Sequence, residues 1–180
     1  MEHGVFPGEV VPAEVTDEAV NSYRLLSADI ASGVAVVSTR LRGRDYAATV
    51  SGFLSVSYDP PTLLVSLYAE SRIAEAVVES GTWALSLLSA RQRGTANWLA
   101  SPGSPLEGLL TQVDYGRGPV TEAAVIEGCI AWFEVRTTSV TTAATHQLVV
   151  GEVVAMGRRA SAEDEADPLV HFASAYSRLG

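Results

Sequence analysis

The stretch that decides the fold is Thr49–Pro61, which reads TVSGFLSVSYDPP. Apart from Phe53, every second residue carries a hydroxyl and the residues between are mostly apolar; the hydroxyl residues are Thr49, Ser51, Ser55 and Ser57. Because a β-strand sends alternate side chains to opposite faces, this pattern predicts a strand with one hydroxyl-rich face. Pro60 and Pro61 end it, since proline cannot donate a ladder hydrogen bond. Two interpretations stay open: solvent wets the hydroxyl face, or a polar ligand lies along it.

The segments on either side of this stretch have the composition of further strands and a few helices. Apolar, β-branched runs predict strands at residues 34–39, 62–68, 83–89, 129–140 and 146–157. Helices are expected over residues 17–33, 71–81 and 90–100, and a loop rich in Gly and Pro over residues 101–121. The first helix would begin with Asp17 as its N-cap and stop at Gly33. Six or so strands with few helices predict a mainly β fold of the α+β class, a small barrel around one core.

The length and composition of the chain fit one globular domain. It has 180 residues, of which 47% are hydrophobic and 18% charged. We divide it into an N-terminal arm over residues 1–20 and a single domain over residues 21–180. No apolar run approaches the roughly 20 residues that a membrane span needs. The first 18 residues lack both a basic region and a long apolar core, so we expect a cytoplasmic protein with no membrane partner.

The charged and reactive residues exclude several classes of function. A formal charge of −9 disfavours nucleic-acid binding, which needs a basic surface. All 12 basic residues are arginine, so a P-loop and Schiff-base chemistry, which both need lysine, are excluded. Cys129 is the only cysteine, so no intrachain disulfide can form. The histidines, His3, His146 and His171, are far apart in sequence, and we expect no metal site.

Ser71 and Arg72 are the strongest candidates for anion binding. They open the predicted helix over residues 71–81, where main-chain N–H groups and the positive end of the helix dipole favour a phosphate. The alternative is that Ser71 only caps the helix and solvent surrounds Arg72. His146 is similarly open to two interpretations, a surface residue or a contact to a ligand, because it begins a long strand after a short connection.

Several segments, taken in order, resemble the flavin reductase-like family of short-chain NAD(P)H:flavin oxidoreductases. They are RLLSADIASGVAVVST, ATVSGFLSVSYDPPTLLVSL, SRIAEAVVESGTWALSLLS, EGCIAWFEV, THQLVVGEV and PLVHFASAY. The likeness runs from Tyr23 to Leu179. It implies a six-stranded antiparallel split barrel of the FMN-binding type with flanking helices, and it identifies residues 21–180 as the split-barrel domain. The chain departs from the family at three places. Gly52 stands where Ser or Asn is common, Ala144-Thr145 stand where Gly-Asp usually precedes the histidine, and Ala173-Ser174 stand where a basic or Gly-rich pair is common.

The resemblance also assigns roles to residues of this chain. Segments on the flavin side would be Ala47–Thr49 and Ser51-Gly52 along the isoalloxazine ring, Ser66–Tyr68 beside the ribityl chain, and Ser71-Arg72 at the phosphate. The individual residues are Ala47, Ala48, Thr49, Ser51, Gly52, Ser66, Leu67, Tyr68, Ser71 and Arg72. His146 and Tyr176 would lie on the nicotinamide side. No side chain is expected to act as a catalytic acid or base, because the flavin itself carries the hydride chemistry.

The function implied by the resemblance is reduction of FMN or FAD by NADH or NADPH. The protein would be a homodimer and would supply reduced flavin to a separate monooxygenase. An alternative is a flavin- or haem-binding split-barrel module without reductase turnover. A third interpretation is a structural dimerisation domain, in which solvent alone covers the hydroxyl face.

Overall fold

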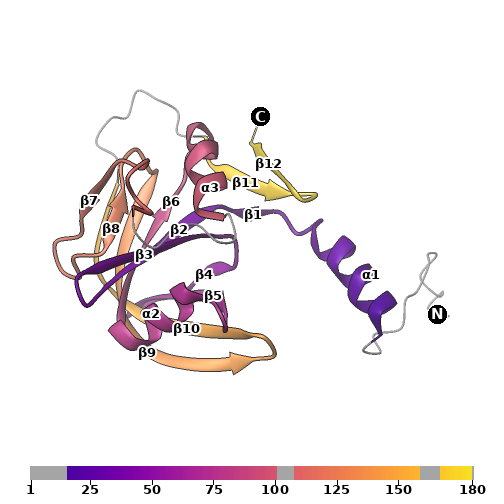
Figure 1. Cartoon of the computed structure of the whole chain (residues 1–180), viewed down its shortest axis with the longest axis horizontal. Coiled ribbons are helices and arrows are strands. Elements are labelled where there is room, and N and C mark those ends of the chain that lie inside the picture. Colours follow the sequence, from indigo (N-terminus) through magenta and orange to yellow (C-terminus); the bar gives the residue numbers. More distant parts are fainter. Residues whose placement is uncertain (1–15, 101–107, 159–166, 180) are drawn as a thin grey trace.

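The computed structural model describes residues 16–100, 108–158 and 167–179, so His3 and most of the predicted arm lie outside the described residues. The first half of the chain contains α1 (Asp17–Ser27), β1 (Ser32–Gly33), β2 (Ala35–Leu41), β3 (Arg44–Val50), β4 (Phe53–Tyr58), β5 (Pro61–Tyr68), α2 (Arg72–Ser80) and β6 (Thr82–Leu87). The second half contains a 3₁₀ turn (Ala90–Gln92), α3 (Arg93–Ala100), β7 (Tyr115–Arg117), β8 (Ala124–Ile126), β9 (Ala131–Ala143), β10 (His146–Arg158), β11 (Leu169–Phe172) and β12 (Ala175–Arg178). Figure 1 shows their arrangement.

The largest sheet in the described part of the chain closes into a barrel. Its strands follow the order β3-β2-β6-β9-β10-β5-β4, and every neighbouring pair is antiparallel. β3 and β4 form its two opposite edges, yet only Ser51 and Gly52 separate them in sequence. The sheet must therefore curl until its edges meet at these two residues, beyond which the edges separate again. This is the geometry of a split barrel, and the predicted mainly β, antiparallel fold is confirmed.

The barrel interior is the first of two apolar cores. It contains alternate residues of the strands, among them Val37, Val65, Trp83 and Val149, all fully buried. Helix α2 covers this core with Ile73, Ala74 and Val77. The predicted start and stop of α2 are confirmed: the Ser71 hydroxyl accepts a hydrogen bond from the main chain of Ala74, and Gly81 ends the helix at φ +69°.

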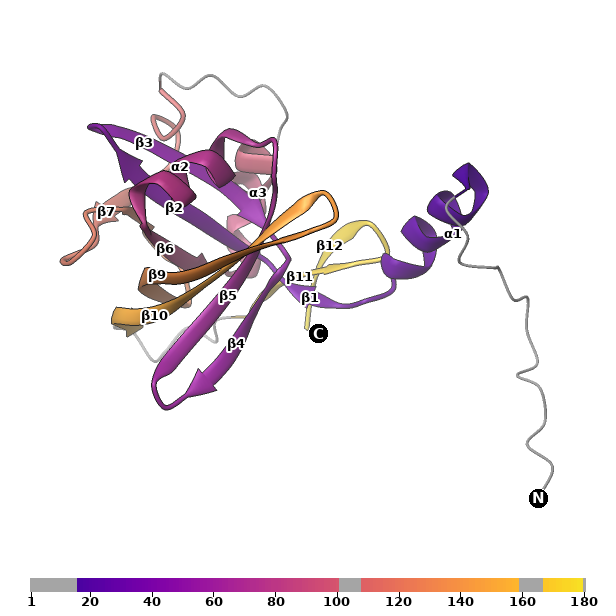
Figure 2. The ribbon, with the colours of Figure 1, turned by 90° about the horizontal axis from the view of Figure 1, so that it is seen from below.

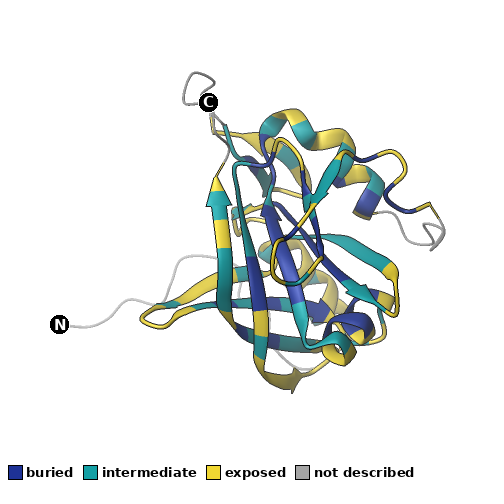
Figure 3. Ribbon diagram, turned by 90° about the vertical axis from the view of Figure 1, so that its left-hand side faces the viewer, coloured by how far each residue is buried: buried dark blue, intermediate teal, exposed yellow. Residues whose placement is uncertain are grey.

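The second core lies on the outside of the barrel wall, under α3 and the β7–β8 hairpin. Val34 and Val36 face it, whereas Ala35 and Val37 face the barrel interior. Both faces of β2 are therefore buried, which explains why its sequence is a continuous apolar run without alternation. Figure 3 shows buried strands at the centre of the molecule and exposed hairpins at its periphery.

Helix α1 differs from its predicted form. It begins after Thr16, whose hydroxyl accepts a hydrogen bond from Ala19, so Asp17 is the first helical residue and not the cap. It ends at Ser27, well before Gly33, and none of its residues is buried. The helix projects away from the barrel (Figures 1 and 2), so its apolar side has no core of this chain to cover. The predicted domain boundary at residues 20–21 falls inside this helix.

Two further segments also differ from the sequence predictions. The stretch Thr49–Pro61 is not one strand but two, because the chain changes sheet edge at Ser51-Gly52, and the barrel sheet therefore has seven strands in its described part. Within the predicted loop, residues 115–117 form β7, a short strand that pairs with β8. Residues 101–107 of that loop lie outside the described residues.

Candidate functional site

The point where the barrel closes brings Gly52 against β5. The Gly52 carbonyl accepts a hydrogen bond of 2.7 Å from the main-chain N–H of Ser66. A Cβ atom on Gly52 would lie 3.2 Å from the Cβ of Ser66, closer than ordinary van der Waals contact. Ser51 and Gly52 are themselves exposed. The closure point is thus an open surface at which another molecule can come close to the main chain.

Strand β3 presents its main-chain edge at this point. Within the described sheet it pairs with β2 alone, so its outer edge has N–H and C=O groups without a strand partner. Most of its side chains contact the rest of the protein: Ala48 packs on the barrel core and Ala47 packs on the core under α3. The Thr49 hydroxyl donates to the Ala96 carbonyl of α3 at 2.7 Å. The hydroxyl face of the opening stretch is therefore divided, since Thr49 bonds within the protein and Ser51 is exposed.

The β5 segment Ser66–Tyr68 continues the site along the strand. Ser66 and Tyr68 point to one face, and Leu67 points to the other, where it is 2% exposed in the barrel core. Only the main chain of Leu67 could contact a ligand. The alternation of residues 62–68 already contained this information, because Leu67 has the parity of the buried Leu63 and Val65.

The N-terminus of α2 follows directly after β5. The Ser71 hydroxyl donates to the Tyr68 carbonyl at 2.6 Å and accepts from the N–H of Ala74 at 3.2 Å. Arg72 is exposed on the first helical turn. A helix N-terminus with an exposed arginine suits a phosphate, because main-chain N–H groups of the first turn are not used inside the helix.

His146 lies beside Tyr68. The register of β5 and β10 sets the two residues directly opposite each other, and their rings meet edge to face with centroids 5.9 Å apart. The N–H of Ala69 donates to the Thr145 carbonyl at 2.9 Å, which fixes the tip of the β9–β10 hairpin to the turn before α2. The structure therefore brings together Gly52, Ser66, Tyr68, Ser71 and His146.

Glu70 and Thr145 also belong to this cluster, although the sequence analysis assigned them no role. Glu70 accepts a hydrogen bond of 3.0 Å from the Tyr68 hydroxyl. The Thr145 hydroxyl lies 3.0 Å from Nδ1 of His146. The only sequence signal was their position next to Ser71 and His146, because the contact itself depends on the register of two strands about 80 residues apart.

Comparison with known proteins settles the family. Residues 26–180 match the family described as the flavin reductase like domain. The chain belongs to this family. A probable flavin reductase of Rhizobium meliloti (strain 1021) is 33% identical over 69% of this chain, which spans 39% of that protein's length. A flavin reductase (NADH) of Kitasatospora aureofaciens is 31% identical over 82% of this chain and 75% of that protein.

A solved structure agrees with this membership of the flavin reductase like family. The flavin reductase component of a bacterial two-component tryptophan halogenase has a TM-score of 0.81 and 28% sequence identity, over 89% of this chain and 98% of that chain. The high coverage of both chains means that the split barrel described above is the fold of that reductase as well.

The turns at Ala144 and at Ala173-Ser174 contain residues other than glycine in a left-handed main-chain conformation. Ala144, at the tip of the β9–β10 hairpin, has φ +51°. Ala173 and Ser174, between β11 and β12, have φ +49° and +59°. Glycine adopts such angles at little cost. Glycine would therefore fit the main chain at Ala144, Ala173 and Ser174 with less strain than the residues present.

Tyr176 lies apart from the cluster around His146. It packs against the core under α3, and its ring meets that of His171 edge to face with centroids 6.0 Å apart. Burial is the main reason why the pKa of its hydroxyl is raised. No contact joins Tyr176 to His146 within the described chain, so a shared nicotinamide-side role for the two residues stays a prediction.

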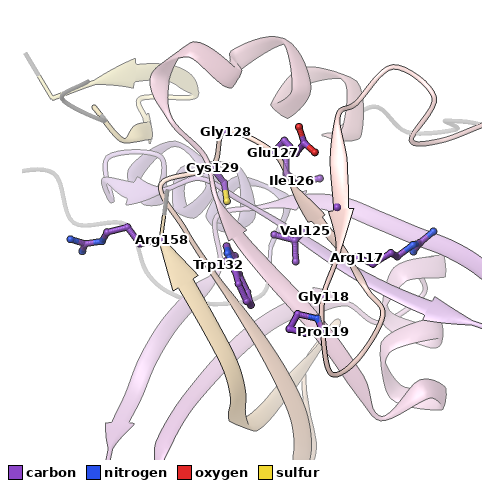
Figure 4. A pocket seen from close by; sticks show the side chains of 11 residues that line it. Arg117, Gly118, Pro119, Val125, Ile126, Glu127, Gly128, Cys129, Trp132 and Arg158 are labelled. Carbon is purple, nitrogen blue, oxygen red and sulfur yellow. The ribbon is translucent and has the colours of Figure 1, made fainter. Parts of the chain in front are cut away.

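A separate hollow of about 260 Å³ lies between the β7–β8 hairpin and the neighbouring ends of β9 and β10 (Figure 4). Val125, Trp132 and the thiol of Cys129 line it, and none of the predicted site residues does. Burial raises the pKa of the Cys129 thiol, so this cysteine is poorly suited to act as a nucleophile. Among the described residues, no three His, Cys, Asp or Glu side chains are grouped to hold a metal ion.

Proposed function

We propose that this protein is an NAD(P)H-dependent flavin reductase, which transfers a hydride from a nicotinamide nucleotide to FMN or FAD. Family membership gives the reaction class. The observation that carries the proposal for this chain is the contact path from Gly52 through Ser66 and Tyr68 to Ser71, because it joins an open main-chain edge to a helix N-terminus with an arginine. A helix N-terminus with an arginine suits the phosphate of a flavin, and an open main-chain edge suits its flat ring.

The residues of the closure point fit a flavin. The outer edge of β3 and the exposed Ser51-Gly52 junction offer N–H and C=O groups to the oxygens and nitrogens of a planar ring. Gly52 has no side chain, so a ring can lie close to the main chain there. Ser66 and Tyr68 face outward along β5 toward the phosphate-binding turn, about 7 Å apart along the strand. When bound, the flavin accepts the hydride, and the protein orients both reactants.

Residues on the nicotinamide side would dock the second nucleotide. His146 and Tyr68 provide exposed ring surfaces beside the flavin site. We assign no side chain as catalytic acid or base, because hydride transfer to flavin requires none at that step. Among the nucleotides, NADH is favoured because the Kitasatospora relative is a flavin reductase (NADH).

The decisive experiment is a flavin-dependent oxidation assay with the purified protein. We expect NADH or NADPH absorbance at 340 nm to fall when FMN or FAD is added, and bound flavin to bleach under anaerobic conditions. Absence of turnover with every combination would overturn the reductase proposal. Yellow protein that neither nucleotide bleaches would instead indicate the binding module without turnover.

Arg72→Ala tests the phosphate assignment. Loss of a hydrogen-bonded charge should weaken flavin binding by about 1.5–3 kcal/mol, roughly ten- to 150-fold in Kd. Arg44→Ala is the matched control, because Arg44 is exposed at the end of β3 remote from Gly52 and should leave the Kd unchanged. Equal Kd values for the Arg72 variant and the wild type would refute the assignment.

We also propose that the protein is a homodimer. Helix α1 exposes Tyr23 and Leu26 at 72% and 66%, and Ile30, just after its end, is 67% exposed. Strand β4 exposes Leu54 and Tyr58. Apolar surface of this extent is rare on a monomer. Light scattering should give twice the chain mass, and Leu26→Asp should reduce it. Val120→Asp, in an exposed turn elsewhere, should leave the mass unchanged.

The reduced flavin would serve a separate oxygenase. This role is supported by the similarity to the flavin reductase component of a bacterial two-component tryptophan halogenase, 98% of which this chain covers. In the described part of the chain, no helix is both long and apolar enough to cross a membrane. Because the reaction consumes reduced nicotinamide nucleotide, we propose that the protein works in the cytoplasm. An oxygenase that hydroxylates its substrate only when this protein, NADH and flavin are present would support the supply role.

A further inference from the structure

We propose that Glu70 and Thr145 are positioning residues for the nicotinamide nucleotide, because together they hold the rings of Tyr68 and His146 in one arrangement beside the phosphate-binding turn. The inference rests on the proposed function, and it adds two residues to it. Neither residue would touch the reacting atoms.

The four side chains form a continuous series of contacts. Glu70 accepts a hydrogen bond of 3.0 Å from the Tyr68 hydroxyl at one end. The Tyr68 ring meets the His146 ring edge to face, with an interplanar angle of 67°. At the other end the Thr145 hydroxyl lies 3.0 Å from Nδ1 of His146. Each ring is therefore held on its outer side by a polar group and on its inner side by the other ring.

The main chain beneath the rings is already fixed. Tyr68 and His146 are opposite partners in the β5–β10 ladder. The N–H of Ser71 donates to the Tyr68 carbonyl at 2.9 Å, and the N–H of Ala69 donates to the Thr145 carbonyl at 2.9 Å. What the backbone does not fix is the rotamer of the two rings, because both side chains are exposed and no core packs around them. Glu70 and Thr145 provide that restraint.

Such a restraint matters for binding more than for folding. When a ligand stacks on an exposed ring, the side chain loses conformational entropy, which weakens binding. A ring that is already ordered loses less. Glu70 also raises the pKa of the Tyr68 hydroxyl, mainly through the hydrogen bond itself. Because all four side chains are exposed, removal of Glu70 or Thr145 should change nucleotide binding and leave the melting temperature unchanged.

The experiment compares steady-state kinetics of the full-length protein and its variants with NADH and FMN. Glu70→Ala should raise the KM for NADH about two- to ten-fold, the effect of one net hydrogen bond, with kcat and the Kd for FMN unchanged. Glu70→Gln, whose amide oxygen still accepts, should restore most of the affinity. Glu75→Ala is the matched control, because Glu75 is an exposed carboxylate on the first turn of α2, the helix that follows Glu70.

A double-mutant cycle shows whether Glu70 acts through Tyr68. In a Tyr68→Phe background, Glu70→Ala should have no further effect on the KM. At the other end, Thr145→Val should raise the KM and Thr145→Ser should not. An unchanged KM in Glu70→Ala, or an equal effect with and without the Tyr68 hydroxyl, would overturn the inference while wild-type turnover upholds the reductase function. A wild type without NADH oxidation would instead refute the function itself, and the positioning role with it.

Discussion

Replacing Gly52 by alanine adds one methyl group at the closure point, where the structure allows its effects on folding and on binding to be worked out separately. The new Cβ would lie 3.2 Å from the Cβ of Ser66 and 3.7 Å from its carbonyl oxygen. Gly52 is not among the residues with positive φ, so the substitution adds no backbone strain. Ser66 needs to move by a few tenths of an ångström, and at this exposed position the free energy of unfolding should fall by about 1 kcal/mol or less.

The effect on flavin binding should be larger. If a flat ring lies against the main chain at Gly52, the methyl group occupies the space of the ring, and the misfit should cost about 1–3 kcal/mol. The Kd would rise by roughly five- to 150-fold. Quenching of flavin fluorescence measures the Kd, and urea unfolding followed by tryptophan fluorescence measures stability.

Gly116→Ala is the matched control for this test. Gly116, in β7, likewise has no positive φ, and a Cβ on it would meet no atom within 4 Å. Neither stability nor flavin Kd should change in that variant. A Gly52→Ala protein that binds FMN and FAD as tightly as the wild type would refute the placement of the ring against Gly52.

Three further predictions concern residues outside the site. Glu134, fully buried, accepts hydrogen bonds from the Thr121 hydroxyl and from two main-chain N–H groups, so Glu134→Ala should cost about 3 kcal/mol or more in urea unfolding. Burial raises the pKa of the Cys129 thiol above its ordinary 9.0. As the pH rises, the unfolded chain therefore loses this proton before the folded chain does, and the free energy of unfolding should fall above about pH 9. The fall should be smaller in Cys129→Ala. Arg117 pairs with Asp45 through two hydrogen bonds, one of 2.7 Å, at a partly exposed position; Arg117→Ala should cost at most about 1 kcal/mol, and less in high salt.

The parts of the fold that local patterns determine could be predicted from the sequence. Helix α2 has its cap at Ser71 and its stop at Gly81 because both depend on chemistry within one turn. The buried run of β2 and the alternation of β5 likewise follow from the faces that each strand covers. The break at Ser51-Gly52 could not be predicted in this way, because the local alternation continues across it. Only the closure of the whole sheet requires the chain to change edge there.

In the candidate site, too, the features that depend on local sequence could be predicted and those that depend on strand pairing could not. Ser71 and Arg72 were recognisable because a helix N-terminus with an arginine is a local feature. The partnership of Tyr68 with His146, and the roles proposed for Glu70 and Thr145, depend on the register of β5 and β10, which no single segment encodes. For helix α1 the local pattern was misleading. The spacing of its apolar residues is that of a helix packed on a core, yet none of its residues is buried in the described chain.

The location of the site follows from the way in which the barrel is built. In a fully closed barrel every strand edge is paired, and no main-chain group of the wall is available to a ligand. Here β3 and β4 are edges that meet only at Ser51-Gly52, so unpaired main-chain groups remain beside the closure point. Natural proteins protect such edges or use them. The absence of a side chain at Gly52 lets the chain pass close to Ser66 and change edge. We propose that it equally lets a flat ring approach the exposed edge. Gly52 therefore lies where the barrel closes, and we propose that the same residue admits the ring of the ligand.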